Sequence, residues 1–392
     1  MNSIFAEKAG GPPCVMSKAS LGSAPSFILF EIVLGFRANS IKRTEIGAVW
    51  SVANAQTAGR STEEMMNKNV GLLLGAGLVI VAGAVAWAAL DQDGEPTWSV
   101  KGTMPYPRSE IAAVEADGKA YVLTGHIPGT QATMFLQEYD PATQAWRELP
   151  LMPFPASHGS AAALDGKIYH VGGFVANVHQ YAQDRVYEYD IATENWRQVA
   201  SLSAPRGSVG VVALNGRIHA IGGRNPGLEV VNTHEIYDPA NNTWTLAAPL
   251  PQARDHLGIV VFNGAIHVFG GRVGDTANPV VDHDVYDAAN DSWTSAGTLN
   301  VPRSAGVGFV LDGKIIYAGG ECKTPDAEVR LAFDNVESYD PSTDSWTVLP
   351  LMPEGRHATA ALVFGDEALI FGGNAGCGGD LRRDTVLSFA YE

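Results

Sequence analysis

Five arginines recur at one place in a repeated sequence pattern. Each of them stands ten residues after a tryptophan: Arg108, Arg206, Arg254, Arg303 and Arg356, with Ala156 as the exception. Guanidinium groups bind carboxylates and phosphates through paired hydrogen bonds, so a ring of five would suit an anionic ligand. The structural alternative is that each arginine pairs within its repeat with an acid such as Glu235, Asp284 or Glu337. The regular recurrence favours this second interpretation.

Histidines offer a second kind of chemistry. Four of the ten follow a glycine pair or open an apolar run, and they are candidate ligand-binding residues because imidazole exchanges protons near neutral pH: His126, His158, His256 and His357. His219 and His267 have the pattern of packed strand residues. The run Asp282-His283-Asp284 has no second His or Cys at ligand spacing. Since phosphate loops and Ser-His-Asp motifs are also missing from the sequence, we predict no metal, no cofactor and no catalytic residue.

Two cysteines follow neighbouring glycine pairs. Cys322 lies two residues after one pair and Cys377 four residues after the next, while Cys14 lies far from both. Outside the cytoplasm such neighbours form disulfides, but sequence alone does not supply the required distance, and the question stays open at this point.

The element that must position these residues is a hairpin that recurs through the chain. In ALDGKIYHVGG (163–173), two apolar runs flank Asp-Gly, which favours a two-residue type I′ turn. Each of six tryptophans precedes the second glycine of a pair by 27 residues, and a tyrosine precedes five of the tryptophans by seven. The tryptophans are Trp98, Trp146, Trp196, Trp244, Trp293 and Trp346; the tyrosines are Tyr139, Tyr189, Tyr237, Tyr286 and Tyr339; the glycine pairs are Gly172-Gly173, Gly222-Gly223, Gly270-Gly271, Gly319-Gly320 and Gly372-Gly373, with Thr124-Gly125 as an imperfect first copy.

This pattern over residues 97–392 resembles the Kelch repeat family, whose unit of about 50 residues forms one four-stranded propeller blade. The resemblance implies an all-β, six-bladed propeller over residues 91–392, with blades at about 101–146, 147–196, 197–244, 245–293, 294–346 and 347–392. The first copy begins with an orphan outer strand, 97–100, which is expected to complete the last blade and close the ring. The glycines, tyrosines and tryptophans are then structural residues.

All length variation lies between the second glycine and the next tyrosine, or Phe389 in the last copy, in the loop that joins the second and third strands. That b–c loop and the d–a loop, which joins one blade to the next, share one face of the ring. Variable loops on a rigid scaffold usually carry function. We therefore expect a binding or scaffold module that presents this loop face to a glycan, a peptide or a protein partner.

An enzyme is the alternative. The fold resembles a sugar-acid enzyme with Kelch blades, N-acetylneuraminate epimerase (a mutarotase), and an anionic sugar would suit the arginines. None of that enzyme's catalytic residues transfers position by position. Galactose oxidase is a weaker resemblance, because its copper site needs a cysteine crosslinked to a tyrosine, which cannot be mapped here.

The N-terminal part predicts export. Residues 70–90 form a run of 21 residues without charge, long enough to span a bilayer as a helix, within a segment, 65–90, that also resembles a signal peptide. Residues 1–64 read as a disordered leader or as the product of a mis-assigned start. Basic residues precede the run and acids follow it, which places the propeller outside the cytoplasm, in the periplasm or its equivalent, anchored to the inner membrane or released by signal cleavage. The formal net charge of −16 argues against nucleic-acid binding.

Overall fold

The computed structural model describes residues 94–391, apart from residues 130, 177–178, 324–329 and 380, and two short strands nearer the N-terminus. Those strands, β1 (Phe30–Val33) and β2 (Gly47–Trp50), pair antiparallel. The chain divides into two compact units, residues 1–90 and 91–392. The predicted membrane or signal segment, 65–90, lies outside the described residues. Among the residues that are described, no helix is long and apolar enough to cross a membrane.

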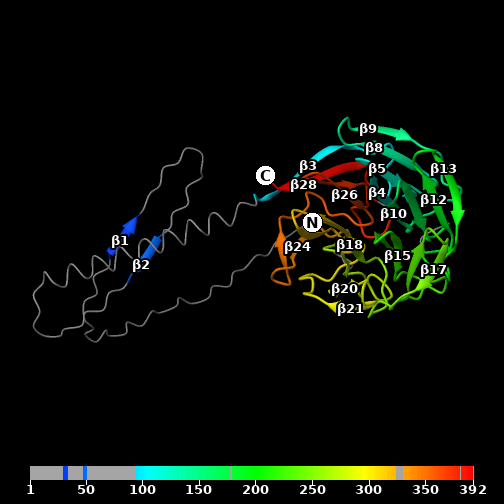
Figure 1. Ribbon diagram of the computed structural model, residues 1–392. Coiled ribbons are helices and arrows are strands. Elements are labelled where there is room, and N and C mark those ends of the chain that lie inside the picture. The colour runs from blue at the N-terminus through cyan, green and yellow to red at the C-terminus, as the bar shows by residue number, and fades with distance from the viewer. Residues whose placement is uncertain are drawn as a thin grey trace, which may run out of the picture. The chain divides into compact units, whose positions relative to one another are not determined.

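The second unit is a six-bladed β-propeller, as the repeats predicted. Its six sheets each have four antiparallel strands and are arranged in a ring (Figure 1). The turns between the two inner strands are the expected ones, since Asp165 (φ 51°) and Gly166 (φ 70°) both have the positive φ of a type I′ turn.

In blades 1 to 5 the strands run from the propeller axis outward in chain order, and in blade 6 the outermost strand comes from the start of the propeller. Blades 1 to 3 consist of β4 (Ala112–Ala116), β5 (Lys119–Leu123), β8 (Leu136–Asp140) and β9 (Ala145–Glu148); β10 (Ser160–Leu164), β11 (Lys167–Val171), β12 (Val186–Asp190) and β13 (Asn195–Val199); and β14 (Gly210–Leu214), β15 (Arg217–Ile221), β16 (His234–Asp238) and β17 (Thr243–Leu246). Blades 4 to 6 consist of β18 (Gly258–Phe262), β19 (Ala265–Phe269), β20 (His283–Asp287) and β21 (Ser292–Ser295); β22 (Val307–Leu311), β23 (Lys314–Ala318), β24 (Val336–Asp340) and β25 (Ser345–Leu349); and β26 (Ala360–Phe364), β27 (Glu367–Phe371), β28 (Thr385–Tyr391) and β3 (Pro96–Thr103). A small hairpin, β6 (His126–Ile127) and β7 (Gln131–Ala132), lies in the b–c loop of blade 1.

The ring closes as predicted, by pairing the first strand of the propeller with the last. Strand β3, which contains the predicted residues 97–100, pairs antiparallel with β28, and the two lie side by side in Figure 1. Trp98 stands opposite Phe389, with ring centroids 4.9 Å apart. Because the two ends of the propeller pair in one sheet, β3 covers the edge of β28 that would otherwise be unpaired.

Tyrosine and tryptophan hold neighbouring blades together. Tyr286 is buried and packs on Trp293 of its own blade, with centroids 5.1 Å apart, while the Trp293 indole N–H donates to the carbonyl of Ala248 at the end of blade 3. Trp196, Trp244 and Trp346 make equivalent bonds. The buried hydrophobic clusters accordingly lie between adjacent blades, and aromatic side chains fill part of the space between the two sheets.

The glycine pairs mark the point of closest approach between blades. A side chain on Gly222 would lie 2.6 Å from the carbonyl oxygen of Arg254 in the next blade, and the Gly223 N–H donates to that same oxygen at 3.1 Å. The second glycine of all six copies, Gly125 included, makes this bond to the next blade. Glycine is favoured at both positions because the neighbouring backbone occupies the space that a Cβ would need; blade 1 has Thr124 at the first position, while the second is glycine in all six copies.

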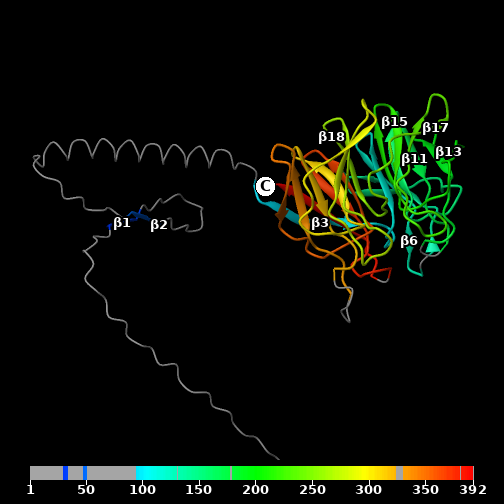
Figure 2. The same ribbon diagram turned by 90° about the horizontal axis from the view of Figure 1, so that it is seen from below.

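The b–c and d–a loops lie on one side of the ring. In Figure 2 the hairpin strand β6 of blade 1 and the red loop of blade 6 project from the same side. This is the loop face on which the sequence concentrates its length variation.

Candidate functional site

Two sets of equivalent positions meet where the loop face reaches the propeller axis. The first set consists of the residues twelve positions after each tryptophan, and we call it the axial ring: Glu110, His158, Ser208, His256, Ala305 and Ala358. All six have a left-handed backbone, with φ between 49° and 57°. Backbone hydrogen bonds connect this ring from blade to blade. The Ser208 N–H donates to the carbonyl of His158 at 2.7 Å, and the Ala358 N–H donates to the carbonyl of Ala305 at 2.9 Å. The backbone is thus constant around the axis while its side chains differ.

The second set directly follows the glycine pairs: His126, Phe174, Arg224, Arg272, Glu321 and Asn374. These residues pair through their backbones with the residue that precedes the axial ring, as Asp255 does with Arg272 and His357 with Asn374. Three members of each set line a common space: Glu110, His158 and His256 from the first, and His126, Arg272 and Glu321 from the second.

That space is a small polar hollow of about 50 Å³ on the loop side of the axial ring. It is lined by Ser109, Glu110, His126, His158, His179, His256, Arg272, Glu321, His357, Gly378, Gly379 and Arg382. A second cavity of about 120 Å³ is lined by all six residues of the axial ring, of which it shares Glu110, His158 and His256 with the hollow, and by the residues that follow them in the chain. The axial ring thus separates the hollow from the interior of the propeller.

The four predicted histidines are brought together here. His126, His158, His256 and His357 all line the hollow, and each is at most 8% exposed. The ring of His158 packs edge-on to those of His126 and His256, with centroids 5.4 Å away in each case. Residues from four different blades therefore contribute imidazoles to one space.

The hollow's charges are paired. Asp255 is fully buried and accepts a hydrogen bond from Arg224 Nε at 2.6 Å and a longer one from Arg272 Nε at 3.3 Å. Arg272 also pairs with Glu321. Burial opposes ionisation of Asp255, yet His256 and the two arginines hold the pKa of its carboxyl below the ordinary value.

Two of the lining imidazoles, His126 and His179, are poor bases in this setting. Burial lowers the pKa of His126 to about 4 and that of His179 to about 2, and the neighbouring His158 lowers both further. His357 Nε2 donates to the carbonyl of Gly376 at 2.9 Å. Among the described residues, His126 Nε2, His179 Nε2 and His357 Nδ1 are buried without a hydrogen-bond partner. Such nitrogens are ready to bond a ligand atom.

The five arginines lie elsewhere. They are buried and engaged inside their own blades: Arg206 pairs with Glu235 at 2.6 Å, Arg254 with Asp284 at 2.8 Å, and Arg303 with Glu337. Arg108 instead donates to Gln137, and Arg356 donates to Thr385 Oγ1 at 2.6 Å. Blade 2, which has Ala156 in place of arginine, has Tyr187 in place of the acid. The proposed anion-binding ring is therefore corrected to the structural alternative, because desolvated guanidiniums bonded inside a blade cannot reach a ligand.

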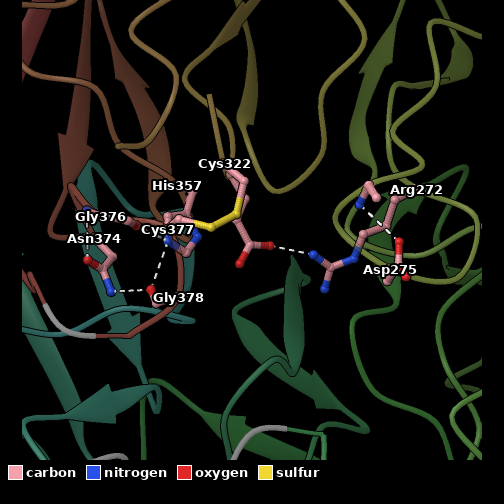
Figure 3. The surroundings of a disulfide bond; sticks show 10 residues. Arg272, Asp275, Cys322, His357, Asn374, Gly376, Cys377 and Gly378 are labelled. Atoms are coloured by element: carbon pink, nitrogen blue, oxygen red, sulfur yellow. Dashed lines mark hydrogen bonds and ion pairs between the residues drawn. A yellow bond between two sulfur atoms is a disulfide. The ribbon is translucent and has the colours of Figure 1, made fainter. Parts of the chain in front are cut away.

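A disulfide braces one side of the hollow. Cys322 and Cys377 are bonded, with their Cα atoms 4.6 Å apart, which joins the b–c loops of blades 5 and 6. Figure 3 shows His357 beside Cys377, with the His357 ring hydrogen-bonded to the carbonyl of Gly378. Arg272 forms an ion pair with Glu321, which directly precedes Cys322. The bond thus fixes two lining segments at once.

Several residues that line the hollow were not predicted from the sequence. Glu110, Arg272 and Glu321 occupy constant offsets from the tryptophans and glycine pairs, so inspection of those offsets could have found them. His179 lies inside a variable loop and carried no such signal. The buried strand histidines, His219 and His267, bond to His234 and His283 instead and take no part in the hollow.

The fold is that of a closed six-bladed propeller with a small hollow on its loop face. The model for the KLHDC2/KLHL20/DRC7 Kelch-repeats domain matches residues 160–373, more than half of the chain. The chain therefore belongs to the Kelch-repeat family, and Kelch propellers generally bind proteins.

Individual relatives match over short stretches. Kelch-like protein terF of Aspergillus terreus is 46% identical over 65 residues (16% of this chain, 14% of that protein), and Kelch-like protein 15 of Danio rerio is 33% identical over 86 residues (21% and 13%). The chain thus spans only a small part of these relatives. The solved structure of YjhT superposes with a TM-score of 0.63 at 16% identity, over 74% of this chain and 97% of that one. This likeness supports the fold.

Proposed function

We propose that this protein is a binding module that recognises a protein or peptide partner on its loop face and seats a small polar group of that partner in the axial hollow. One observation carries the proposal. The axial ring repeats its backbone conformation in all six blades while its side chains diverge, so the fold does not dictate those side chains. Divergent polar residues on a constant scaffold are typical of recognition sites.

The surroundings of the hollow favour a protein or peptide over a glycan. The b–c loops of four blades each expose a large apolar side chain: Tyr181 (71%), Leu228 (52%), Leu331 (45%) and Leu381 (41%). Apolar contacts around a polar centre suit a polypeptide partner. At about 50 Å³ the hollow accommodates a few atoms, such as a carboxylate or amide group, rather than a whole sugar.

The experiment is selection of binders from a phage-displayed random peptide library by the immobilised full-length protein, with a glycan array in parallel. We expect Tyr181→Ser and Leu228→Ser to weaken binding of the selected peptides at least about tenfold. Leu246→Ser is the matched control, because Leu246 is 74% exposed on the outermost strand β17, away from the loops. Peptide binding that tolerates both loop variants, or specific binding of glycans alone, would contradict the proposal.

We also propose that the propeller works outside the cytoplasm, as the apolar segment 70–90 suggests. The disulfide between Cys322 and Cys377 supports this location, because structural disulfides persist in oxidising compartments. Protease added to intact spheroplasts should then degrade the propeller. Full protection of the propeller until the membrane is permeabilised would place it inside.

A sugar-active enzyme is the second candidate, favoured by one contact. Glu110 Oε1 lies 3.2 Å from His158 Nε2 in the hollow, a pairing that can shuttle a proton. Accelerated exchange between the anomers of a sialic acid, lost in Glu110→Gln, would establish it; no acceleration would exclude it for that substrate. The galactose-oxidase resemblance loses support, because Cys322 and Cys377 are bonded to each other and neither is free to crosslink to a tyrosine.

A further inference from the structure

Three imidazoles in the hollow form a nearly regular triangle. His158 and His256 belong to the axial ring in blades 2 and 4, and His179 reaches them from the b–c loop of blade 2. Their ring centroids are 4.9 Å (His158 to His179), 5.3 Å (His179 to His256) and 5.4 Å (His158 to His256) apart. One nitrogen of each ring lies within 4.8 Å of one nitrogen of both others.

Two of these histidines are backed by carboxylates. Glu110 Oε1 lies 3.2 Å from His158 Nε2, and Asp255 Oδ2 lies 3.1 Å from His256 Nδ1, in ion-pair range but off the hydrogen-bond direction. A carboxylate behind an imidazole is the usual outer support of a metal-binding histidine, because it orients the ring and makes the other nitrogen more basic. In this structure those other nitrogens contact serine hydroxyls, His158 Nδ1 at 3.1 Å from Ser157 Oγ and His256 Nε2 at 3.3 Å from Ser208 Oγ, and a metal ion would replace both contacts. His179 supplies a buried Nε2 that has no hydrogen-bond partner among the described residues.

The charges near the triangle tolerate a cation. The positive charge of Arg272 would repel a metal ion here, because Arg272 Nη2 lies 3.3 Å from His256 Nε2. Its charge is compensated by Asp255, whose Oδ1 is 3.3 Å from Arg272 Nε, and by Glu321.

We propose that His158, His179 and His256 bind one divalent first-row transition-metal ion, of the kind that zinc exemplifies. Three imidazoles suit zinc, cobalt, nickel or copper, and three protein ligands leave a fourth position for a group that enters the hollow. Nitrogens around a tetrahedral zinc are about 3.4 Å apart, so the rings must close in by roughly 1 Å. His179, partly exposed on its loop, can supply most of that movement. The site is independent of which partner the loop face recognises.

The test is titration of the full-length protein, made without a polyhistidine tag and dialysed against a chelator, with Co²⁺. We expect visible d–d absorption that saturates at one equivalent and is displaced by Zn²⁺. His179→Ala should weaken cobalt binding by at least about 100-fold. His179→Asp, which restores a ligand, should recover part of it. His219→Leu combined with His234→Val is the matched control, because this histidine pair lies inside blade 3 and takes no part in the hollow, and the variant should bind cobalt like the unaltered protein.

Thermal unfolding of each variant shows whether it is folded. The proposal is overturned if the unaltered protein gives no d–d absorption at one equivalent of Co²⁺. It is equally overturned if folded His179→Ala binds as tightly as the unaltered protein, or if the control variant of His219 and His234 loses binding to the same extent as His179→Ala.

Discussion

Inside blade 3 the carboxylate of Glu235 lies 2.6 Å from the guanidinium of Arg206, and both side chains are at most 3% exposed. Arg206 also donates to the carbonyls of Gly222 and Thr233, so it ties the inner strands of the blade together. Its own carbonyl accepts the Gly173 N–H of the preceding blade. One residue thus connects strands within a blade and blades within the ring.

Removing this arginine should therefore lower stability. We expect Arg206→Met to reduce the free energy of unfolding by about 3–5 kcal/mol, because Glu235 would be left as an uncompensated buried charge. Arg206→Met combined with Glu235→Met should cost less than the single change. Urea unfolding followed by tryptophan fluorescence measures both.

The matched control is Arg217→Met in the same blade. Arg217 is half exposed and lies 3.4 Å from Asp238, so its loss should cost less than about 1 kcal/mol. If Arg206→Met proved as stable as Arg217→Met and instead abolished ligand binding, the anion-binding interpretation of the arginines would return.

A tyrosine hydroxyl and an aspartate join blades 3 and 4. Tyr286 donates to Asp291 Oδ1 at 2.8 Å, and the same oxygen accepts the Ala248 N–H of the previous blade at 2.7 Å. Asp291→Ala should lose about 1–3 kcal/mol, from two broken bonds and from alanine in a left-handed backbone (φ 46°). Asp291→Gly removes the bonds without that strain and should lose less.

Asp291→Asn is the control for this link between blades. Asn242 makes the same two bonds in blade 3, to Tyr237 and the Ala200 N–H, so asparagine should preserve stability at position 291. Differential scanning calorimetry compares the three variants. An asparagine variant as unstable as the alanine one would show that charge, rather than hydrogen bonding, matters there.

Acid should destabilise the propeller through two buried histidine pairs. His219 Nδ1 lies 2.9 Å from His234 Nε2, and His267 Nδ1 is 2.9 Å from His283 Nε2. Burial lowers the pKa of each to about 4, below the ordinary value of about 6.5. Between these two pKa values the histidines bind protons in the unfolded chain but not in the folded one. The free energy of unfolding should therefore fall as the pH drops from about 6.5 to about 4.

A double variant isolates the contribution of one pair to this pH dependence. Blade 6 has Leu369 and Val386 at the equivalent positions, so His219→Leu with His234→Val should keep the packing and flatten the slope of unfolding free energy against pH. An unchanged slope would mean that other groups govern the acid response.

Reduction of the disulfide should loosen the hollow. The bond closes a sequence separation of 55 residues, so losing it should cost about 2–4 kcal/mol. Dithiothreitol is expected to lower the midpoint of thermal unfolding of the unaltered protein and to leave that of the variant with serine at both positions unchanged. Two thiols that label with iodoacetamide in the unreduced native protein would show that the bond is absent.

The architecture was predictable because each contact between blades uses the same residue types. A glycine whose N–H meets the next blade's carbonyl, or a tryptophan that bonds the previous one, must recur at the same offset in every copy. The spacing of 27 residues from Trp244 to Gly271 is therefore a property of the blade itself. The same regularity correctly indicated that Arg206, with its partner Glu235, is structural.

The hollow could be predicted only in part. The offsets of His158 and His256 placed both on the loop face, because strand direction alone determines that face. Their approach to each other, to His179 and to Glu110 depends on how six blades close around an axis, which brings His256 against His158 across about 100 residues of chain. The sequence by itself therefore determined the propeller, its closure and the face that varies. Only the tertiary structure decided which side chains converge there, because distances across the axis arise from packing among all the blades and are not encoded in any single repeat.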